Sequence, residues 1–304
     1  MGKHSSSLSI FLLLLLLQLT SILNSQSTNA SLPDTEVRAL GDIASKLNMK
    51  PMRYYSAQSC SDYYNSRISC NCSYNSNTVC HVTEMSLYSN QLTGSIPEEL
   101  GNLTFLTYLD LSDNYLNGPI PESLGTLHSL VSLYLYNNFL NGSIPAALGE
   151  LSSLKYLYMG QNQLSREIPD ELGNITTLIT LSLLENQLSG NLPPGLGNLT
   201  NLERLWLPSN NFTGKLPESF AKLTNLQVFT ILGNNMSGQI PSFIQKWKNL
   251  TTLSLMGNNF EGPLPLEIFK LEKLDTLWVS DLRNNYEPRF HFPPLSKLTS
   301  LNSL

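Results

Sequence analysis

The sequence predicts an α/β solenoid: a superhelix of 24-residue repeats with a short parallel β-sheet on the concave face and a helical, disulfide-linked N-terminal cap. The first observation is an asparagine that recurs every 24 residues, at Asn90, Asn114, Asn138, Asn162, Asn186, Asn210, Asn234 and Asn258. The second is a proline with the same period, from Pro97 to Pro265. The third is a glycine with that period, from Gly94 to Gly262, replaced once by Arg166.

Residues 1–25 have the organisation of a secretory signal peptide. Lys3 precedes an apolar run over 10–17, and small and polar residues follow from Ser21 to Ala30. The run is about half the length that spans a bilayer, and no later stretch reaches ~18 apolar residues. We therefore expect entry into the secretory pathway, cleavage between Asn24 and Ala30, and no membrane span in this chain.

Residues 26–84 are expected to form the cap. Val37, Leu40, Ala44 and Leu47 recur at helical spacing, and Asp34 is available as the N-cap of that helix. The helix would therefore bury one apolar face against the first coil.

Four cysteines lie within 21 residues of the cap, at Cys60, Cys70, Cys72 and Cys80. In a secreted chain this clustering indicates two disulfides. Paired CxxC spacing is absent and the compartment oxidises thiols, so no metal is expected. Of the three connectivities, the one containing Cys70–Cys72 is least favoured because its ring would be strained. We favour Cys60–Cys70 with Cys72–Cys80, and Cys60–Cys72 with Cys70–Cys80 stays open.

Residues 85–281 contain the repeats, of which LTFLTYLDLSDNYLNGPIPESLG (103–125) is one. Leu109 and Leu111 alternate with polar residues, which predicts a short strand with one buried face. Stacking pairs these strands in parallel and joins their leucines into one core. The asparagine follows the strand, where its amide could satisfy the backbone of its own turn and of the next one. Arg166 must either adopt a positive φ or shift its corner.

Residues 282–304 break the pattern. The ladder position 282 is Leu, Pro288, Pro293 and Pro294 interrupt the period, and leucines resume it at 298, 301 and 304. Repeat arrays need a terminal cap, and none is visible. We therefore expect this segment to be a degenerate repeat region that is truncated within a strand.

Side chains that alternate with the buried leucines should project from the concave sheet into solvent. The candidate ligand- or partner-binding residues are Tyr108, Asp110, Tyr134, Tyr136, Tyr156, Tyr158, Glu185, Arg204 and Trp206. The same alternation places smaller residues beside them, at Ser112, Ser132, Thr180, Ser182 and Ser254. Tyrosine, tryptophan and arginine dominate interface hot spots, whereas tyrosine is also favoured in strands for its β-propensity. We favour the interaction surface.

N-x-S/T sequons avoid the six residues before each ladder asparagine. The candidate glycosylation sites are Asn102, Asn141, Asn174, Asn198, Asn211, Asn235 and Asn249. Asn29 lies beside the expected cleavage zone, and Asn71 adjoins two cysteines. Glycans should therefore coat the edges and the convex side and leave the concave sheet bare.

No catalytic chemistry is predicted. The sequence contains no GxGxxG, GxxxxGK, GxSxG or HExxH motif. His4, His81, His128 and His291 are scattered without a repeat-matched carboxylate or cysteine partner. A net charge of −5 gives no basic footprint for nucleic acid. We expect no enzyme activity, no cofactor and no nucleic-acid partner.

The consensus LxxLxxLxLxxNxLxGxIPxxLGxL resembles that of plant extracellular leucine-rich-repeat proteins, chiefly receptor-like kinases and secreted glycosidase inhibitors. The segment 32–47 is similar to their capping helix. The segments ISCNCSYNSNTVCHVTEMSL (68–87) and VSDLRNNYEPRFHFPPLSKLTSLNSL (279–304) resemble the receptor-like serine/threonine kinases that carry a malectin-like domain after their repeats. This resemblance implies a kinase domain elsewhere in a full-length relative.

The resemblance implies an extracellular or cell-surface recognition module for a peptide, glycan or protein ligand, with a co-receptor as a further partner. In a full-length receptor it would lie at the plasma membrane and act in signalling. The alternatives are a secreted inhibitor of a cell-wall-degrading glycosidase, which should end with its own cap, and a nonfunctional truncated product.

Overall fold

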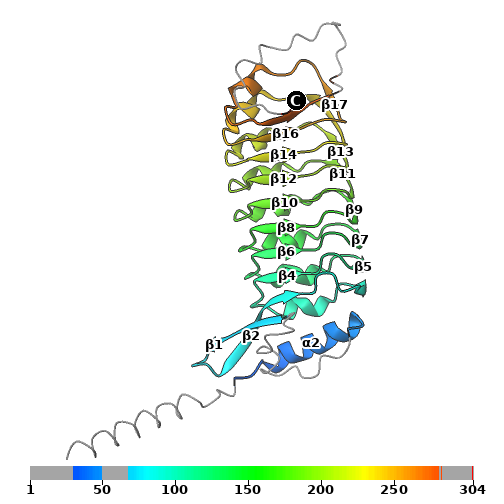
Figure 1. Ribbon diagram of the computed structural model, residues 1–304, viewed down its shortest axis with the longest axis vertical. Coiled ribbons are helices and arrows are strands. Elements are labelled where there is room, and N and C mark those ends of the chain that lie inside the picture. The colour runs from blue at the N-terminus through cyan, green and yellow to red at the C-terminus, as the bar shows by residue number, and fades with distance from the viewer. Residues whose placement is uncertain (1–29, 50–67, 281, 283–302, 304) are drawn as a thin grey trace, which may run out of the picture.

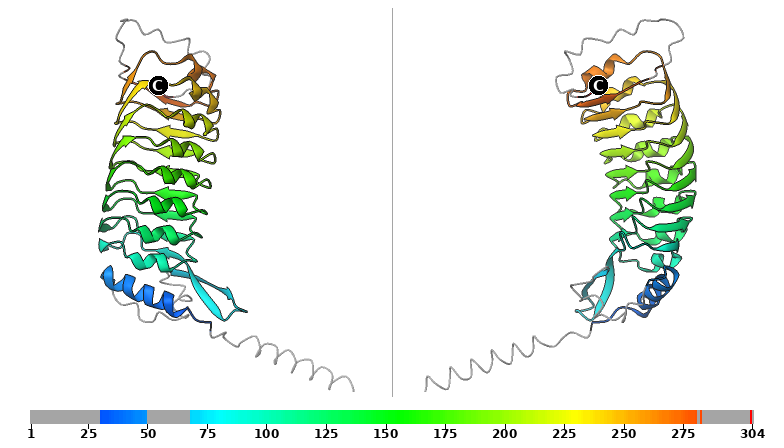
Figure 2. Two further views of the ribbon diagram at one scale, coloured as in Figure 1. Left: turned by 180° about the vertical axis from the view of Figure 1, so that it is seen from behind. Right: turned by 45° about the vertical axis from the view of Figure 1, so that its right-hand side comes forward.

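The computed structural model describes residues 30–49, 68–280, 282 and 303 (Figure 1). The predicted signal peptide, Cys60 and nearly all of 282–304 lie outside these described residues. The predicted α/β solenoid is confirmed. Coils stack one upon another from the capping helix α2 (Asp34–Lys46) at one end, and short helices repeat along the stack (Figures 1 and 2).

A ten-stranded sheet runs along the concave face. Its strands are β1 (Ile68–Tyr74), β2 (Val79–Ser86), β4 (Tyr108–Asp110), β6 (Ser132–Tyr134), β8 (Tyr156–Tyr158), β10 (Thr180–Ser182), β12 (Arg204–Trp206), β14 (Val228–Thr230), β16 (Thr252–Ser254) and β18 (Thr276–Trp278). β1 and β2 form an antiparallel hairpin, and each later strand pairs in parallel with its neighbours. Leu109 lies opposite Leu133, so equivalent positions of successive coils form columns.

A second sheet of eight parallel strands, which the repeat pattern did not predict, follows the asparagine turns. Its strands are β3 (Thr93–Ser95), β5 (Tyr115–Gly118), β7 (Phe139–Gly142), β9 (Gln163–Arg166), β11 (Gln187–Asn191), β13 (Asn211–Gly214), β15 (Asn235–Gln239) and β17 (Asn259–Glu261). Arg166 adopts a φ of 70° where most coils have glycine, so the corner keeps its place. The arginine therefore occupies the left-handed region that ordinarily favours glycine.

Short 3₁₀ helices cover the third side of each coil. They are η2 (Glu98–Asn102), η3 (Glu122–Thr126), η4 (Ala146–Glu150), η5 (Asp170–Asn174), η6 (Pro194–Asn198), η7 (Glu218–Lys222), η8 (Ser242–Lys246) and η9 (Leu266–Lys270). The periodic proline immediately precedes each one, and its restricted φ leads the extended chain into the turn.

The cap closes the first coil with α2 and the β1–β2 hairpin. Leu40 and Ile43 are buried on the inner face of α2. The N-cap expectation is wrong: Pro33 takes that position and Asp34 is the first helical residue, because Pro33 has the extended backbone that precedes a helix. Lys46 forms an ion pair with Glu99, which ties the helix end to η2.

The expected disulfide between Cys72 and Cys80 is confirmed, and it links β1 to β2. Cys70 is also disulfide-bonded, whereas Cys60 lies outside the described residues. The short hairpin is thus held covalently at the end of the solenoid where strand pairing begins.

His81 has a carboxylate partner in the cap, although no carboxylate recurs beside it at the repeat spacing. Its Nδ1 contacts Oε1 of Glu36, a buried residue of α2. The other oxygen of Glu36 accepts a hydrogen bond from the backbone amide of Val82 at 2.8 Å. The carboxylate is therefore satisfied by the hairpin, and the contact binds the cap helix to the first strands.

The asparagine ladder connects each coil to the preceding one. Asn186 donates from Nδ2 to the carbonyl of Met159, 3.0 Å away in the preceding coil, and to Leu183 in its own turn. Its Oδ1 accepts from the amide of Leu164 at 2.9 Å. The direction differs from our expectation, because the amide reaches back to the turn before it rather than forward to the next one.

Candidate ligand-binding face

Aromatic rings form a row across the first half of the concave sheet. The ring centroids of Tyr134 and Tyr158 lie 5.1 Å apart with an interplanar angle of 19°, so these rings are stacked. Tyr108 lies 5.5 Å from Tyr134, and Trp206 lies 6.1 Å from Tyr158. All four rings are partly exposed. The row presents a nearly continuous amphipathic surface over five successive strands, β4 to β12.

The row crosses one coil without an aromatic residue. Ser182 of β10 lies between the strands that carry Tyr158 and Trp206, and it is 2% exposed. The two rings approach each other across this coil, because a small side chain leaves space above the sheet. Thr180 is buried in the same strand, between Tyr156 and Arg204.

The sequence predicted that the small residues of the concave strands face solvent, and this prediction is wrong because they are buried. Those buried at alternate strand positions are Ser112, Ser132, Thr180, Ser182 and Ser254. Strand alternation specifies the side of the sheet on which a residue lies, whereas the neighbouring rings determine whether water reaches it. These small residues form the floor of the face, and the aromatic residues form its accessible surface.

Asp110 is also buried, in contrast to the expectation that it projects into solvent. Its Oδ2 accepts a hydrogen bond from the Tyr108 hydroxyl at 3.2 Å, and its Oδ1 accepts from the Ser112 amide at 3.0 Å and from the Ser112 hydroxyl. We assign Asp110 a positioning role beneath the rings, because both of its oxygens already have partners within the sheet.

Three tyrosines of the face, Tyr108, Tyr134 and Tyr136, have a pKa above the ordinary value for the residue and stay neutral over a wide pH range. Desolvation, with the negative charge and hydrogen bond of Asp110, raises the pKa of Tyr108 to about 12. Burial also raises the pKa of Tyr134 and of Tyr136. The face therefore offers hydroxyl donors beside apolar ring surface, which suits a ligand with both polar and apolar groups.

A polar column borders the face, at the residue that precedes each ladder asparagine. Asp113, Asn137, Gln161, Glu185 and Ser209 all have positive φ there. Asn137 donates to Asp113, and Gln161 donates to Oε2 of Glu185 at 3.2 Å. The predicted site residue Glu185 thus belongs to this border, and the polar residue that stands immediately before these ladder asparagines was the available sequence signal.

Arg204 lies at the far end of the aromatic row. Its guanidinium approaches Glu203 Oε2 at 3.4 Å, and both side chains are substantially exposed. Such a pair contributes little stability and leaves the guanidinium accessible. Beyond it, Met256 and Trp278 are each 41% exposed on the face.

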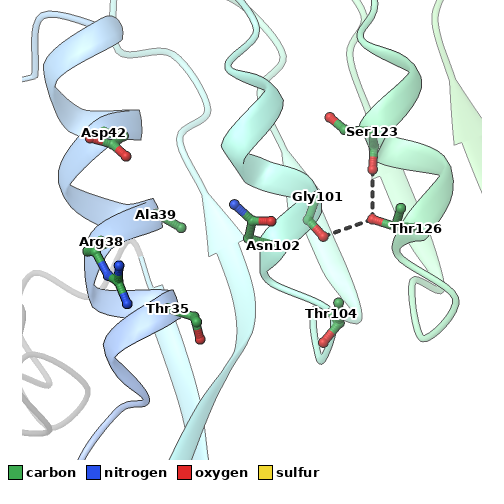
Figure 3. A pocket seen from close by; sticks show the side chains of 9 residues that line it. All are labelled: Thr35, Arg38, Ala39, Asp42, Gly101, Asn102, Thr104, Ser123 and Thr126. Atoms are coloured by element: carbon green, nitrogen blue, oxygen red, sulfur yellow. Dashed lines mark hydrogen bonds between the residues drawn. The ribbon is translucent and has the colours of Figure 1, made fainter.

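A separate cleft of about 620 Å³ lies between the cap and the first short helices (Figure 3). Arg38 and Asp42 of α2 line one side, and Asn102 of η2 and Ser123 of η3 line the other. The lining contains no paired nucleophile and base. A glycan on the exposed Asn102 would extend from this cleft, so it is a poorer candidate than the concave face.

The described part of the chain contains no cluster of potential metal ligands. No helix in it is both long and apolar enough to cross a bilayer. The predicted sequons lie outside the strands of the concave sheet: Asn102, Asn174 and Asn198 end short helices, Asn141, Asn211 and Asn235 belong to the second sheet, and Asn249 lies between η8 and β16. Asn249 is partly buried, and the other six candidate sites are exposed.

Two sequence models of the leucine-rich repeat match the chain. The leucine-rich repeat region matches 62–183, and the Leucine Rich Repeat matches 177–199, 201–223 and 249–271. Together they cover more than half of the sequence, so the chain belongs to the leucine-rich-repeat proteins. No curated protein matches it.

Three solved structures of plant receptors are similar to the chain. The ectodomain of GASSHO1/SCHENGEN3 from Arabidopsis thaliana, in complex with CASPARIAN STRIP INTEGRITY FACTOR 2, is 36% identical over 66% of this chain and 24% of that one, with a TM-score of 0.65. The plant peptide hormone receptor RGFR1 in complex with RGF2 is 40% identical over 68% and 33%, with a TM-score of 0.64.

The Arabidopsis receptor kinase HAESA, in complex with the peptide hormone IDA and the co-receptor SERK1, is 31% identical over 83% of this chain and 42% of that one, with a TM-score of 0.69. The chain therefore spans less than half the length of each of the three structures. Its repeat region resembles the ectodomains of plant leucine-rich-repeat receptor kinases.

Proposed function

We propose that the chain is an extracellular recognition module that binds an extended peptide along its concave sheet. The observation that carries this proposal is the row of rings from Tyr108 through Tyr134 and Tyr158 to Trp206, which no segment of the described chain covers. Aromatic side chains supply large contact areas with few rotors, and their polar ends can pair with a peptide backbone.

The shape of the face supports a linear ligand. The row runs across successive strands, so a chain lying along it would contact one or two residues from each coil. The similarity to receptors solved with peptide hormones supports the same class of ligand. The partly exposed Arg204 adds one cationic group at the end of the row.

The experiment is a selection of random 12-residue peptides on the secreted chain, followed by affinity measurements on variants. The double variant Tyr134→Ala/Tyr158→Ala should weaken the selected peptides at least about tenfold, since two hot-spot rings typically carry more than 1 kcal/mol each. Leu266→Ala removes a 64% exposed apolar residue on η9 and is the matched control.

Equal binding to the wild type and the tyrosine variant would contradict a concave peptide site. The melting midpoint should change little in both variants. A large fall for the tyrosine variant would show instead that the rings mainly stabilise the sheet. Binding of the same face to an immobilised oligosaccharide, lost in the tyrosine variant, would assign a glycan ligand.

We further propose that the chain is the leading part of a receptor-like kinase of the subfamily with a malectin-like domain. The segments 68–87 and 279–304 support this assignment by their resemblance to that subfamily. Secretion through the peptide 1–25 and glycosylation at the exposed sequons belong to the same proposal. The coding sequence that follows Leu304 is the direct test, because a malectin-like segment, a membrane span and a kinase should follow.

A further inference from the structure

Two aromatic rings are exposed on the second sheet, away from the concave face. Tyr115 of β5 is 52% exposed and Phe139 of β7 is 49% exposed. Their centroids lie 6.2 Å apart with an interplanar angle of 13°, so the rings are nearly parallel. The two adjacent rings form a small exposed apolar patch that a ligand or a covalently attached group could cover.

A sequon begins two residues after Phe139, in the same strand. Leu140 is fully buried, whereas Phe139 and Asn141 are both exposed. Because side chains alternate along a strand, Phe139 and Asn141 project from the same side. Two residues of a strand span about 7 Å, so a sugar attached to Asn141 could fold back onto the Phe139 ring.

This arrangement distinguishes Asn141 from the other sequons of the described segments. Trp247, two residues before Asn249, is fully buried. Ser209 precedes Asn211 and Gly233 precedes Asn235 at the same spacing, and neither has a ring. The leucines that precede Asn102, Asn174 and Asn198 at this spacing are buried.

We propose that the first N-acetylglucosamine of a glycan on Asn141 packs on the ring of Phe139, with Tyr115 extending this platform. The C–H face of the pyranose is apolar and complements an aromatic face, while its hydroxyl and acetamide groups stay in water or meet polar side chains. The glycan then becomes a structural part of the second sheet and covers its exposed apolar patch.

The neighbouring surface suits a carbohydrate. A cleft of about 280 Å³ lies beside the two rings, and its lining includes Gln91, Asp113 and Asn137. Amide and carboxylate groups are the hydrogen-bonding partners that sugar hydroxyls require. The next residues of the glycan would therefore find polar contacts at the turn edge, adjacent to the platform.

The experiment compares the secreted, glycosylated chain with Phe139→Ala, Asn141→Gln and their double variant. Glycopeptide mass spectrometry should show Asn141 occupied. Either single substitution should lower the melting midpoint by about 2–4 °C, the size expected for one modest contact in a chain of this length. The double variant should melt no lower than Asn141→Gln, because the ring and the sugar act through one contact.

Asn211→Gln is the matched control, since Asn211 is an exposed sequon residue of the same sheet without a ring before it. Its substitution should leave the melting midpoint unchanged. Phe139→Trp should retain the stabilisation and Phe139→Leu should lose it. If the substituted chains are not secreted, enzymatic trimming of the wild-type glycans to one sugar should preserve the midpoint, and complete removal should lower it.

The inference rests on the proposed secretion of the chain. The same experiments distinguish a failure of that proposal from a failure of the contact between the glycan and Phe139. Absence of glycan at every sequon would contradict secretion. Occupancy elsewhere with a bare Asn141, or equal effects of Phe139→Ala with and without Asn141, would overturn the platform alone. The peptide-binding proposal is unaffected by either result, because its residues lie on the other sheet.

Discussion

Each inner asparagine of the ladder satisfies buried backbone groups of two successive coils. The Asn186 amide makes hydrogen bonds to Met159, Leu183 and Leu184 carbonyls and accepts one from the Leu164 amide. Its side chain therefore replaces the water that these turns would otherwise need. The ladder holds neighbouring coils in register, while the leucines supply the burial that drives stacking.

We expect Asn186→Leu to lower the free energy of unfolding by roughly 1–3 kcal/mol, the usual cost of leaving buried polar groups without partners. Chemical denaturation, monitored by circular dichroism, measures the change. Gln187→Leu is a suitable control because Gln187 is the exposed neighbour in β11. Equal effects of the two substitutions would contradict a specific role for the ladder amide.

Tyr108 links the aromatic row to the pH dependence of stability. Its pKa rises from 10.0 to about 12 in the folded chain, chiefly through desolvation and then through the charge of Asp110. As the pH rises, the hydroxyl of Tyr108 therefore loses its proton in the unfolded chain before it does so in the folded chain. The contribution of neutral Tyr108 to the free energy of unfolding is present below pH 10 and disappears as the pH rises towards 12. Tyr108→Phe should reduce the loss of stability across this interval.

Denaturation midpoints at a series of alkaline pH values would measure that effect, and phenolate absorbance would follow the titration itself. Asp110→Asn should shift the highest tyrosine pKa downward, because the charge and hydrogen bond that oppose ionisation are removed. An unchanged alkaline titration in this variant would show that Asp110 does not control Tyr108.

Among the elements, the 24-residue period predicted the strands of the concave sheet but not the second sheet. Alternation at Leu109 and Leu111 is sufficient for a short strand, and β4 contains the first of these leucines. The strands of the second sheet are harder to predict. β7, for example, has only four residues, so its alternation of exposed and buried side chains is too short to distinguish a strand from a polar loop. The burial of Asp110 depends on Tyr108 and Tyr134 from two strands, so no single segment could reveal it.

The short helices show why one glycine recurs on the convex side. A Cβ at Gly173 of η5 would lie 2.2 Å from the carbonyl oxygen of Gly195 in the next coil. Such a contact forces the two coils apart, because the obstacle is backbone. In contrast, a Cβ at Gly41 of α2 would have nothing within 4 Å.

We therefore expect opposite results from the same substitution in two elements. Gly173→Ala should lower the free energy of unfolding by about 1–3 kcal/mol through overpacking. Gly41→Ala should raise it by up to about 1 kcal/mol, because alanine is the better residue in a helix interior. Thermal and chemical denaturation of the two variants provide the comparison, and destabilisation by both would contradict it.

At the scale of the molecule, stability is a property of neighbouring coils rather than of one central core. Each coil contacts the coil before it and the coil after it, as the strand order of both sheets shows. In such a quasi-one-dimensional stack, the ends determine how far fraying penetrates. The cap is joined to the first coil by the pairing of β2 with β4 and by the Lys46–Glu99 ion pair, and the Cys72–Cys80 bond holds the cap hairpin together.

Removal of that disulfide tests how far the cap stabilises the repeats. Cys72→Ser/Cys80→Ser opens a loop with a sequence separation of 8, for which chain entropy alone predicts a loss of about 2–3 kcal/mol. Hydrogen-exchange mass spectrometry should show the greatest loss of protection in β1, β2 and β4 and progressively smaller losses towards β14. That gradient follows because coupling passes only between adjacent coils. A uniform loss of protection from β2 to β16 would instead show that the solenoid opens as a single cooperative unit.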